Sequence, residues 1–324
     1  MKRTALSVLL IAVLLFAAAC SPVYEDAVNF AMGAAVTQKI YGAGKDCADA
    51  ALESIKALEE EISYRKEGAL AYFNAGGTLS SGDAYELILQ SDELRRLTGG
   101  AYDITVLPLV RVWGFDTDLP ALPSEEEIAL ALEKVGGENI IIDENGASIV
   151  NGAQADLSAA GKGAACQKAI ETYKAYGASG GIVTVGGSVG VFGAKNGKEF
   201  TVAVRDPFDK TSFLALLTLT DCYISTSGSY EKQFTADGVN YHHLLDPVTG
   251  YPVQNGLVSV TVVCFDGALS DMLSSACFCM GEEKSIAVLG HYSAQAMFVY
   301  SNGDIRVTRG MEEYINCEKY EVIP

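Results

Sequence analysis

The sequence predicts an α+β protein in which mixed or antiparallel sheets pack against helices. Segments with apolar residues at helical spacing occur in blocks, most clearly over residues 45–62, 80–100 and 123–137. Long apolar β runs follow one another from residue 180 onward and are joined by turns. This arrangement differs from the regular alternation of strand and helix that predicts a parallel sheet with crossover helices.

The N-terminal segment MKRTALSVLLIAVLLFAAAC predicts export. Lys2 and Arg3 precede an apolar run that ends in small residues, as in a signal peptide. The run is shorter than the roughly 20 apolar residues that a spanning helix requires. AAAC resembles the lipobox of bacterial lipoproteins, in which cleavage leaves Cys20 as a lipid-carrying N-terminus; the alternative is ordinary cleavage beside an incidental cysteine. We expect a signal peptide over residues 1–19, a lipid-anchored tether over 20–27 and one domain over 28–324, held at the extracytoplasmic face of the cell membrane.

Three amphipathic segments predict the first helices. Residues 45–62 keep one apolar face throughout. The second segment ends at Gly99 and Gly100, which are typical of a helix C-terminus. In the third, Ser124 and Glu127 stand at capping-box spacing, so that helix is expected to begin just after Ser124.

Most of the remaining regular structure is expected to be strand. Residues 139–150, NIIIDENGASIV, predict a hairpin that turns at Glu-Asn-Gly. Further strands are expected over residues 180–193, 199–207, 213–226, 257–265 and 294–308.

The protein is strongly acidic, with a formal net charge of −18 at pH 7. Such a charge disfavours binding of nucleic acid, or of an anionic membrane, through the protein's own surface. A polyanionic ligand is therefore expected to need metal ions as intermediaries.

Seven cysteines remain when Cys20 is set aside. An odd number cannot pair completely, and most of them lie in apolar runs such as VTVVCF and SSACFCMG, so buried free thiols are expected. Cys277 and Cys279 lack a second Cys or His pair at zinc-ligand spacing.

Glycine-rich segments offer the first candidate binding sites. DLSAAGKGAACQKAIETY, from Asp156, places a turn of small residues before a helix expected to run roughly from Lys162 to Tyr176. Such a helix N-terminus suits phosphate, because its N–H groups are free and its dipole end is positive. GKG is not a P-loop, since the upstream glycine and the following Ser or Thr are missing. The glycines of VGGSVGVFG are explained equally well by close packing or bulges inside a β run.

Two further groups of polar residues could carry chemistry. Asp271 and Ser275 are four residues apart on an expected helix, so their oxygens share one face and could bind a hard cation. The alternative is that Asp271 only stabilises the first helical turn. His242 and His243 are adjacent on an expected strand and face opposite sides. Either could act as a general base, although a histidine flanked by tyrosine is often a packed core residue.

Eight segments of the chain occur in one order: FAMGAAVTQKIYG, AYDITVLPLVRVWGF, DLSAAGKGAA, VTVGGSVGVFG, VRDP, STSGSYEKQF, YHHLLDPVTGYPV and LVSVTVVCFDGALSDMLSSACFCMG. In this order and spacing they resemble the ApbE family, the FAD:protein FMN transferases. The resemblance covers nearly all of the chain after the tether and implies the family's α+β, T-fold-like architecture.

The resemblance implies a metal-dependent transfer reaction. FAD is split at its pyrophosphate, FMN is joined by a phosphoester to a Ser or Thr hydroxyl of an exported or membrane-facing protein, and AMP leaves. Bound Mg²⁺, or Ca²⁺, would offset the charge of the pyrophosphate and of the transition state. The implied partners are FAD, an acceptor protein with a Ser or Thr motif and, through the lipid anchor, the membrane; nucleic acid is not among them.

The resemblance also assigns site residues by position. The implied metal ligands are the backbone carbonyl of Ala159, the carboxylate of Asp271 and the hydroxyl of Ser275, where relatives commonly carry Thr. His243, not His242, matches the family histidine, and it is implied to accept the proton of the acceptor hydroxyl or to orient FAD. The implied flavin-binding residues are Met32, Tyr64, Ala101, Tyr102, Asp103, Asp156, Lys162 and His243.

The chain departs from the family pattern at a few positions. Ser158 and Ala160 stand where glycine and a larger apolar residue are common, and AYFN replaces a segment that usually carries arginine. These changes leave the implied metal ligands in place and affect the adenine pocket. Two alternative activities are a metal-dependent FAD pyrophosphatase, which releases FMN and AMP, and a lipoprotein that binds flavin without catalysis.

Overall fold

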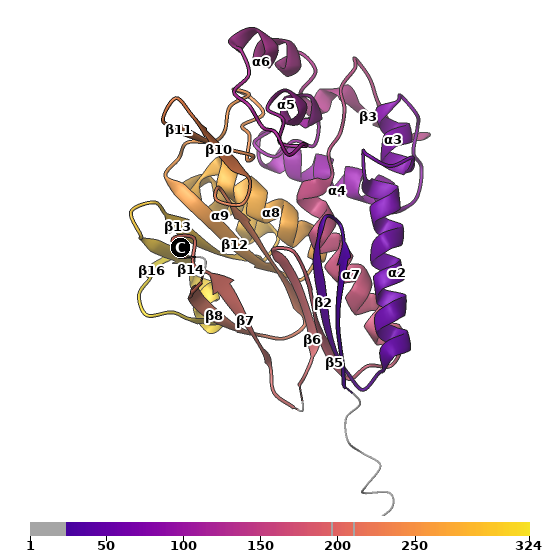
Figure 1. Cartoon of the computed structure of the whole chain (residues 1–324), viewed down its shortest axis with the longest axis vertical. Coiled ribbons are helices and arrows are strands. Elements are labelled where there is room, and N and C mark those ends of the chain that lie inside the picture. Colours follow the sequence, from indigo (N-terminus) through magenta and orange to yellow (C-terminus); the bar gives the residue numbers. More distant parts are fainter. Residues whose placement is uncertain (1–23, 196, 210) are drawn as a thin grey trace, which may run out of the picture.

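The computed structural model describes residues 24–324 except for positions 196 and 210 (Figure 1). The predicted signal peptide, Cys20 and the first part of the predicted tether lie outside these residues. Within the described part of the chain, no helix has both the length and the apolar character needed to cross a bilayer.

A nine-stranded sheet forms the centre of the molecule, with the strand order β1-β2-β5-β6-β9-β12-β13-β14-β16. Neighbouring strands are antiparallel except for β14 and β16, which are parallel. The predicted α+β class with a mixed, mainly antiparallel sheet is therefore confirmed. The strand bounds are β1 (Tyr24–Ala31), β2 (Ala34–Tyr41), β5 (Gly180–Val185), β6 (Ser188–Gly193), β9 (Cys222–Gly228), β12 (Leu257–Cys264), β13 (Gln295–Tyr300), β14 (Ile305–Thr308) and β16 (Glu321–Ile323).

Helices cover one face of this sheet, and a small second sheet covers part of the other (Figure 1). Three helices on that face are α7 (Ser158–Ala175) and α8 (Gly267–Met280), which lie over the central strands, and α2 (Lys45–Ile62), which packs on α7 and the edge strand β1. The largest hydrophobic core, which includes Val262 and Phe278, fills the space beneath them. A second core, which includes Leu217 and Val299, lies under the small sheet. The strands of that sheet are β7 (Phe200–Arg205), β8 (Phe213–Leu219) and β15 (Ile315–Asn316).

A third, smaller core lies where α5, α6 and the hairpin β10–β11 meet. Trp113 stacks on Phe115 with ring centroids 6.1 Å apart, and its indole N–H donates to the Gly250 carbonyl at 2.8 Å. This core therefore anchors the loop that follows β11, which carries His243. The remaining elements are α3 (Ala69–Asn74), α4 (Asp83–Leu97), α5 (Leu107–Val112), α6 (Glu125–Leu132), α9 (Glu282–His291), η1 (Gly137–Asn139), η2 (Arg309–Glu313), β3 (Ile140–Asp143), β4 (Gly146–Ile149), β10 (Gln233–Ala236) and β11 (Val239–His242).

Most of the predicted elements are confirmed. α2 has the predicted bounds, and Ser124 and Glu127 form the predicted capping box at the start of α6. The predicted hairpin is β3–β4. All seven cysteines in the described part of the chain are free thiols, and five of them are buried.

Two boundaries differ from the prediction. α7 begins at Ser158 rather than near Lys162, because the Leu157 carbonyl already accepts two N–H groups at 3.0 Å. The small residues expected to form a turn are thus the first turn of the helix. β1 begins at Tyr24, so residues 24–27, predicted as tether, instead pair with β2.

Two glycines let α7 and α8 cross with their backbones in contact. A Cβ added to Gly163 would lie 1.9 Å from the Gly267 carbonyl oxygen, and a Cβ added to Gly267 would lie 2.4 Å from the Gly163 carbonyl oxygen. Any side chain at either position would therefore push the helices apart. The crossing brings the first half of α7 against the first half of α8, where the predicted metal ligands lie.

Candidate active site at the crossing of α7 and α8

Asp271 joins the two helices at their crossing. Its Oδ2 accepts hydrogen bonds from the backbone N–H groups of Lys162 and Gly163, both at 3.1 Å, and lies 3.6 Å from Lys162 Nζ. The side chain is 4 % exposed. All of its hydrogen bonds to described residues end on Oδ2, so Oδ1 remains available for another ligand.

The structure brings Ala159 and Ser275 to the same crossing. In an α-helix the carbonyl of one residue faces the N–H four residues later. The Ala159 carbonyl therefore lies beside the Gly163 N–H, which donates a hydrogen bond to Asp271. Ser275 follows Asp271 by one turn on the same face of α8 and is half-buried. In the described residues, no three His, Cys, Asp or Glu side chains gather to hold a metal ion. The predicted ligands differ from such a cluster, since they are one carboxylate, one hydroxyl and one carbonyl.

The charge state of Lys162 follows from its ion pair with Asp271. The Asp271 carboxylate raises the pKa of the Lys162 ammonium, against the opposing effect of burial. Lys162 also lies close to the turn between β5 and β6, since a Cβ on Gly186 would be 3.3 Å from its Cδ. An ammonium held between a carboxylate and a glycine turn stays charged and suits a phosphate ligand.

The two adjacent histidines have different surroundings. His242, the last residue of β11, is buried; its Nε2 lies 3.0 Å from the Val253 carbonyl, and its ring packs edge-on against Phe278 of α8. His243 follows the strand and points toward Phe115, with ring centroids 6.5 Å apart. Its Nδ1 is buried and has no hydrogen-bond partner among the described residues. Burial lowers the pKa of His243 to about 3, helped by Lys232 and Lys162, so the ring is neutral.

The Met32 side chain packs against the first turn of α7. It forms the two-residue turn between β1 and β2 with Gly33, and both residues have positive φ, 56° and 65°. This is the preferred geometry for a tight hairpin, but it is strained for a residue with a side chain. A Cβ on Gly161 would lie 3.0 Å from Met32 Cε, so the thioether rests against the first turn of α7.

Tyr64 and Asp156, on the rim of the site, lie close enough to interact electrostatically. The Tyr64 ring has the guanidinium carbons of Arg65 and Arg111 at 5.2 Å and 6.0 Å from its centroid. Burial raises the pKa of Tyr64, and the charge of Asp156 adds to that effect. Asp156 is buried and accepts the Ser158 N–H at 2.8 Å. Burial raises the pKa of Asp156, opposed by the hydrogen bond from Ser158 and by Lys232 and Arg65.

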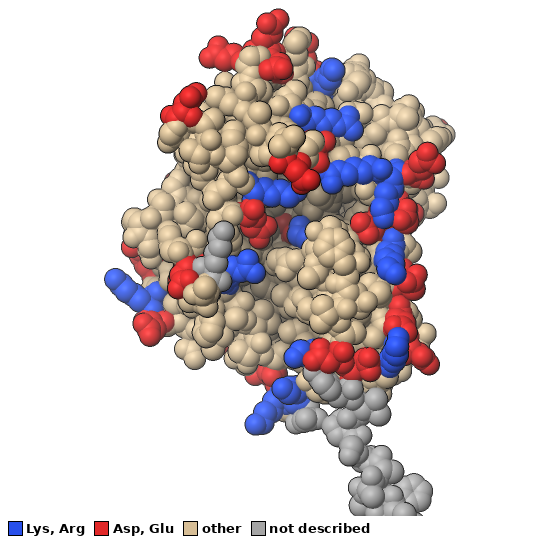
Figure 2. Space-filling model, viewed as in Figure 1, with Lys and Arg blue, Asp and Glu red and all other residues tan. Residues whose placement is uncertain are grey.

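Cationic side chains gather around these residues despite the acidity of the protein. Figure 2 shows Lys and Arg side chains across the hollowed middle of this face. Glu231 lies next to the turn at Gly187. It is close enough to three cationic side chains to interact with them electrostatically, namely Lys162, Arg205 and Lys232. The local charge of this face therefore differs from the average over the whole chain.

Four of these cations were missing from the sequence prediction: Arg65, Arg111, Arg205 and Lys232. Two signals pointed to them. Arg65 directly follows Tyr64, and Lys232 ends the STSGSYEK part of a segment that resembles the family. Arg111 and Arg205 also lie in segments that resemble the family, AYDITVLPLVRVWGF and VRDP, but neither residue is next to a predicted site residue in the sequence.

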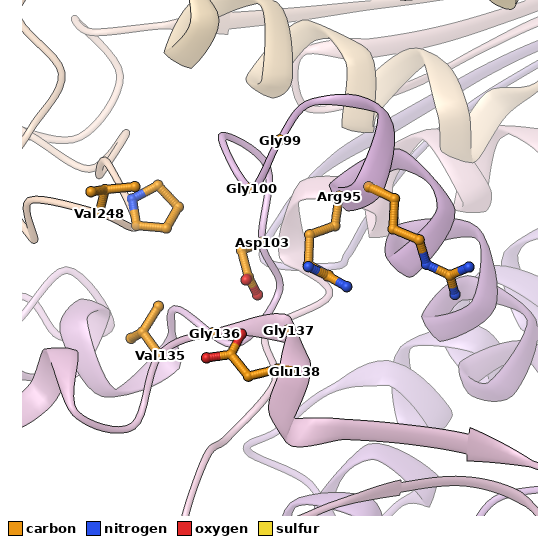
Figure 3. Close-up of a pocket in the computed structure, with 11 residues that line it drawn as sticks. Arg95, Gly99, Gly100, Asp103, Val135, Gly136, Gly137, Glu138 and Val248 are labelled. Carbon is orange, nitrogen blue, oxygen red and sulfur yellow. The ribbon is translucent and has the colours of Figure 1, made fainter.

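The predicted residues Ala101 to Asp103 are less directly joined to this cluster. Tyr102 is buried, and its hydroxyl has no partner among the described residues. Asp103 accepts the Thr105 N–H and hydroxyl at 2.8 Å and 2.6 Å, and burial raises its pKa. It lines a pocket of about 470 Å³ between the end of α4, the loop before β3, and Val248 (Figure 3). No other residue predicted to bind flavin lines this pocket.

Comparison with known proteins identifies the group to which this arrangement belongs. The ApbE family matches residues 32–298. An FAD:protein FMN transferase of Escherichia coli K12 is 31 % identical over 255 residues, covering 75 % of this chain and 73 % of the relative. One of Treponema pallidum is 29 % identical over 295 residues, covering 82 % and 81 %.

Solved structures agree with the sequence matches. The ApbE protein of Thermotoga maritima superposes with a TM-score of 0.83 at 31 % identity, covering 90 % of this chain and 99 % of that one. The flavin transferase ApbE of Vibrio cholerae gives a TM-score of 0.80 at 26 % identity, covering 90 % and 99 %. The chain therefore belongs to the ApbE family.

Proposed function

We propose that the protein is a cation-dependent FAD:protein FMN transferase. The hydroxyl oxygen of a Ser or Thr on a partner protein forms a bond to the phosphorus on the FMN side of the FAD pyrophosphate. The bond from that phosphorus to the bridging oxygen breaks, and AMP leaves with the electron pair. The hydroxyl proton passes to the solvent or to a nearby base. The family match and the names of the relatives support this activity, and the crossing of α7 and α8 supports the site.

The residues at the crossing fit a hard cation such as Mg²⁺ or Ca²⁺. Asp271 has Oδ1 left over, Ser275 offers a hydroxyl oxygen and Ala159 a carbonyl oxygen, and oxygen is the donor that both ions prefer. A bound cation would supply Lewis-acid stabilisation of the pyrophosphate charge. Lys162 would pair with a phosphate oxygen beside it, while its backbone N–H keeps Asp271 in position.

The rim residues would bind the rest of the dinucleotide. Tyr64 offers a flat ring and Met32 a soft apolar contact, both suited to an aromatic ring system. Arg65, Arg111 and Lys232 add positive charge at the entrance. His243 would accept a hydrogen bond from the acceptor hydroxyl at a ring nitrogen, because its neutral ring keeps a lone pair free at any pH above about 3.

The test is to incubate the purified protein with FAD, Mg²⁺ and a peptide that bears the acceptor Ser or Thr. We expect flavin fluorescence on the peptide in a gel and release of AMP, both abolished by a chelator and by Asp271→Ala. Flavinylation undiminished by Asp271→Ala would contradict the proposed cation site. AMP and free FMN without flavinylated peptide would identify a pyrophosphatase instead.

We also propose that Cys20 carries lipid and holds the protein at the extracytoplasmic face of the membrane. The lipobox-like AAAC segment supports this. The protein is expected in the membrane fraction of cells, and Cys20→Ala is expected to release it. If both forms fractionate alike, the anchor is refuted.

A further inference from the structure

A chain of buried hydroxyls runs behind the proposed cation site. Ser227 of β9 is 8 % exposed, and its Oγ lies 2.9 Å from Ser275 Oγ and 2.7 Å from Ser274 Oγ. The Ser274 hydroxyl in turn donates to the backbone carbonyl of Asp271 at 2.8 Å. The chain thus begins at one proposed cation ligand and ends on the main chain of another.

The direction of every hydrogen bond in this chain follows from counting protons. A carbonyl oxygen can only accept, so the single hydroxyl proton of Ser274 is used on Asp271. Ser227 must therefore donate to Ser274. Because Ser227 has then used its own proton, the contact between Ser227 and Ser275 requires Ser275 to donate.

This direction matters for a cation, which binds lone pairs and repels protons. With its proton turned toward Ser227, Ser275 Oγ presents its lone pairs on its other sides. The same contact restrains the Ser275 rotamer, which in Thr would be restricted by the β-branched methyl. Serine lacks that methyl, so Ser227 supplies the restraint from the neighbouring strand.

We propose that Ser227 is a positioning residue that orients the Ser275 hydroxyl as a cation ligand. The inference rests on the proposed function, since it requires a cation at Asp271 and Ser275. Ser227 acts through its hydrogen bond to Ser275 and not as a ligand itself, so its removal should affect cation affinity more than the rate at saturating cation.

The strand offers a matched control in Ser225. It lies two residues before Ser227 on the same face of β9 and is fully buried. Its hydroxyl contacts Ser188 and Ser270 at 3.0 Å and 2.9 Å, and Ser270 lies on α8 as Ser275 does. Ser225→Ala therefore removes an equally buried bridge between β9 and α8 without touching Ser275.

The test measures Mn²⁺ binding to the full-length protein by electron paramagnetic resonance of the free ion, and the Mg²⁺ dependence of AMP release. Partners that hold a metal ligand in place typically change affinity by roughly 10- to 100-fold. Ser227→Ala is therefore expected to raise the Mn²⁺ dissociation constant about tenfold or more, with a smaller change in the rate at saturating Mg²⁺. Ser225→Ala is expected to leave the dissociation constant unchanged. Ser275→Thr added to Ser227→Ala is expected to restore much of the affinity.

Equal Mn²⁺ affinity in Ser227→Ala and Ser225→Ala would overturn the inference while leaving the proposed function intact, provided that Asp271→Ala weakens binding. If Asp271→Ala also leaves binding unchanged, both fall together. Should Ser227→Ala not fold, Ser274→Ala decides. That variant frees the proton of Ser227 to point at Ser275, so weaker Mn²⁺ binding supports the inference and unchanged binding refutes it.

Discussion

The crossing of α7 and α8 and the rim of the site are built in different ways. At the crossing, two helices touch backbone to backbone at Gly163 and Gly267, and Asp271 bonds directly to the main chain of α7. At the rim, Tyr64 and His243 lie on connecting segments, and long cationic side chains surround them. Positions at the crossing are held by backbone contacts and backbone hydrogen bonds, whereas the charge at the rim comes from long side chains. Changes at the crossing should thus affect folding and cation binding together, and changes at the rim should affect FAD binding without weakening cation binding.

The largest effect is expected from Gly163→Ala. The added Cβ would lie 1.9 Å from the Gly267 carbonyl, so the helices must separate. Overpacking of this kind costs on the order of 3 kcal/mol. Urea unfolding should show that loss, together with loss of cation-dependent AMP release. Gly290→Ala in α9 is the matched control, because no atom lies within 4 Å of its added Cβ; that variant is expected to be as stable as the wild type or slightly more so. A fully stable Gly163→Ala would contradict the close crossing.

A smaller effect, on FAD binding alone, is expected from Tyr64→Ala. Stacking of a base on an aromatic side chain is worth about 1–3 kcal/mol, so FAD affinity should fall roughly tenfold or more. Tyr64→Phe keeps the ring and is expected to bind FAD like the wild type. Fluorescence titration of FAD measures both. If Tyr64→Ala weakens Mn²⁺ binding as much as FAD binding, the rim and the crossing are not separable.

A still smaller effect on FAD binding, which depends on salt, is expected from Lys232→Ala. The side chain acts on Asp156 and His243 across the entrance, and an exposed charge of this kind is worth about 1 kcal/mol or less. The KM for FAD should rise a few-fold at low salt and approach the wild-type value at high salt. A rise that persists unchanged in high salt would indicate a direct contact rather than general charge.

An effect confined to acidic solution is expected in the pH dependence of stability. The folded-state pKa of His243 is lowered to about 3, below the ordinary value of 6.5, so the unfolded chain binds more protons between those values. His243 therefore contributes stability that is complete above pH 6.5 and declines as the pH falls toward 3. Replacing it by His243→Asn should flatten the decline of the melting temperature in this range. An identical decline in the variant would place the effect in other groups.

The sequence predicted the crossing better than the rim. Asp271 and Ser275 could be paired because a spacing of four residues on a helix determines a shared face, and the two histidines could be separated because strand neighbours alternate. The cations of the rim come from four distant segments, so only the tertiary fold brings them together. The net charge of the whole chain, −18, gave no indication that cationic side chains gather at this place. The sequence placed the start of α7 near Lys162, several residues after its true start at Ser158, because serine, alanine and glycine are equally compatible with a turn.

The central claim, that a cation binds where α7 crosses α8, is tested most directly by anomalous scattering from crystals of the protein grown with Mn²⁺. We expect an anomalous peak at about 2.0–2.6 Å, the range for Mg²⁺ and Ca²⁺ bonds to oxygen, from Asp271 Oδ1, Ser275 Oγ and the Ala159 carbonyl. A peak bound elsewhere, with Lys162 Nζ still against Asp271, would contradict the claim.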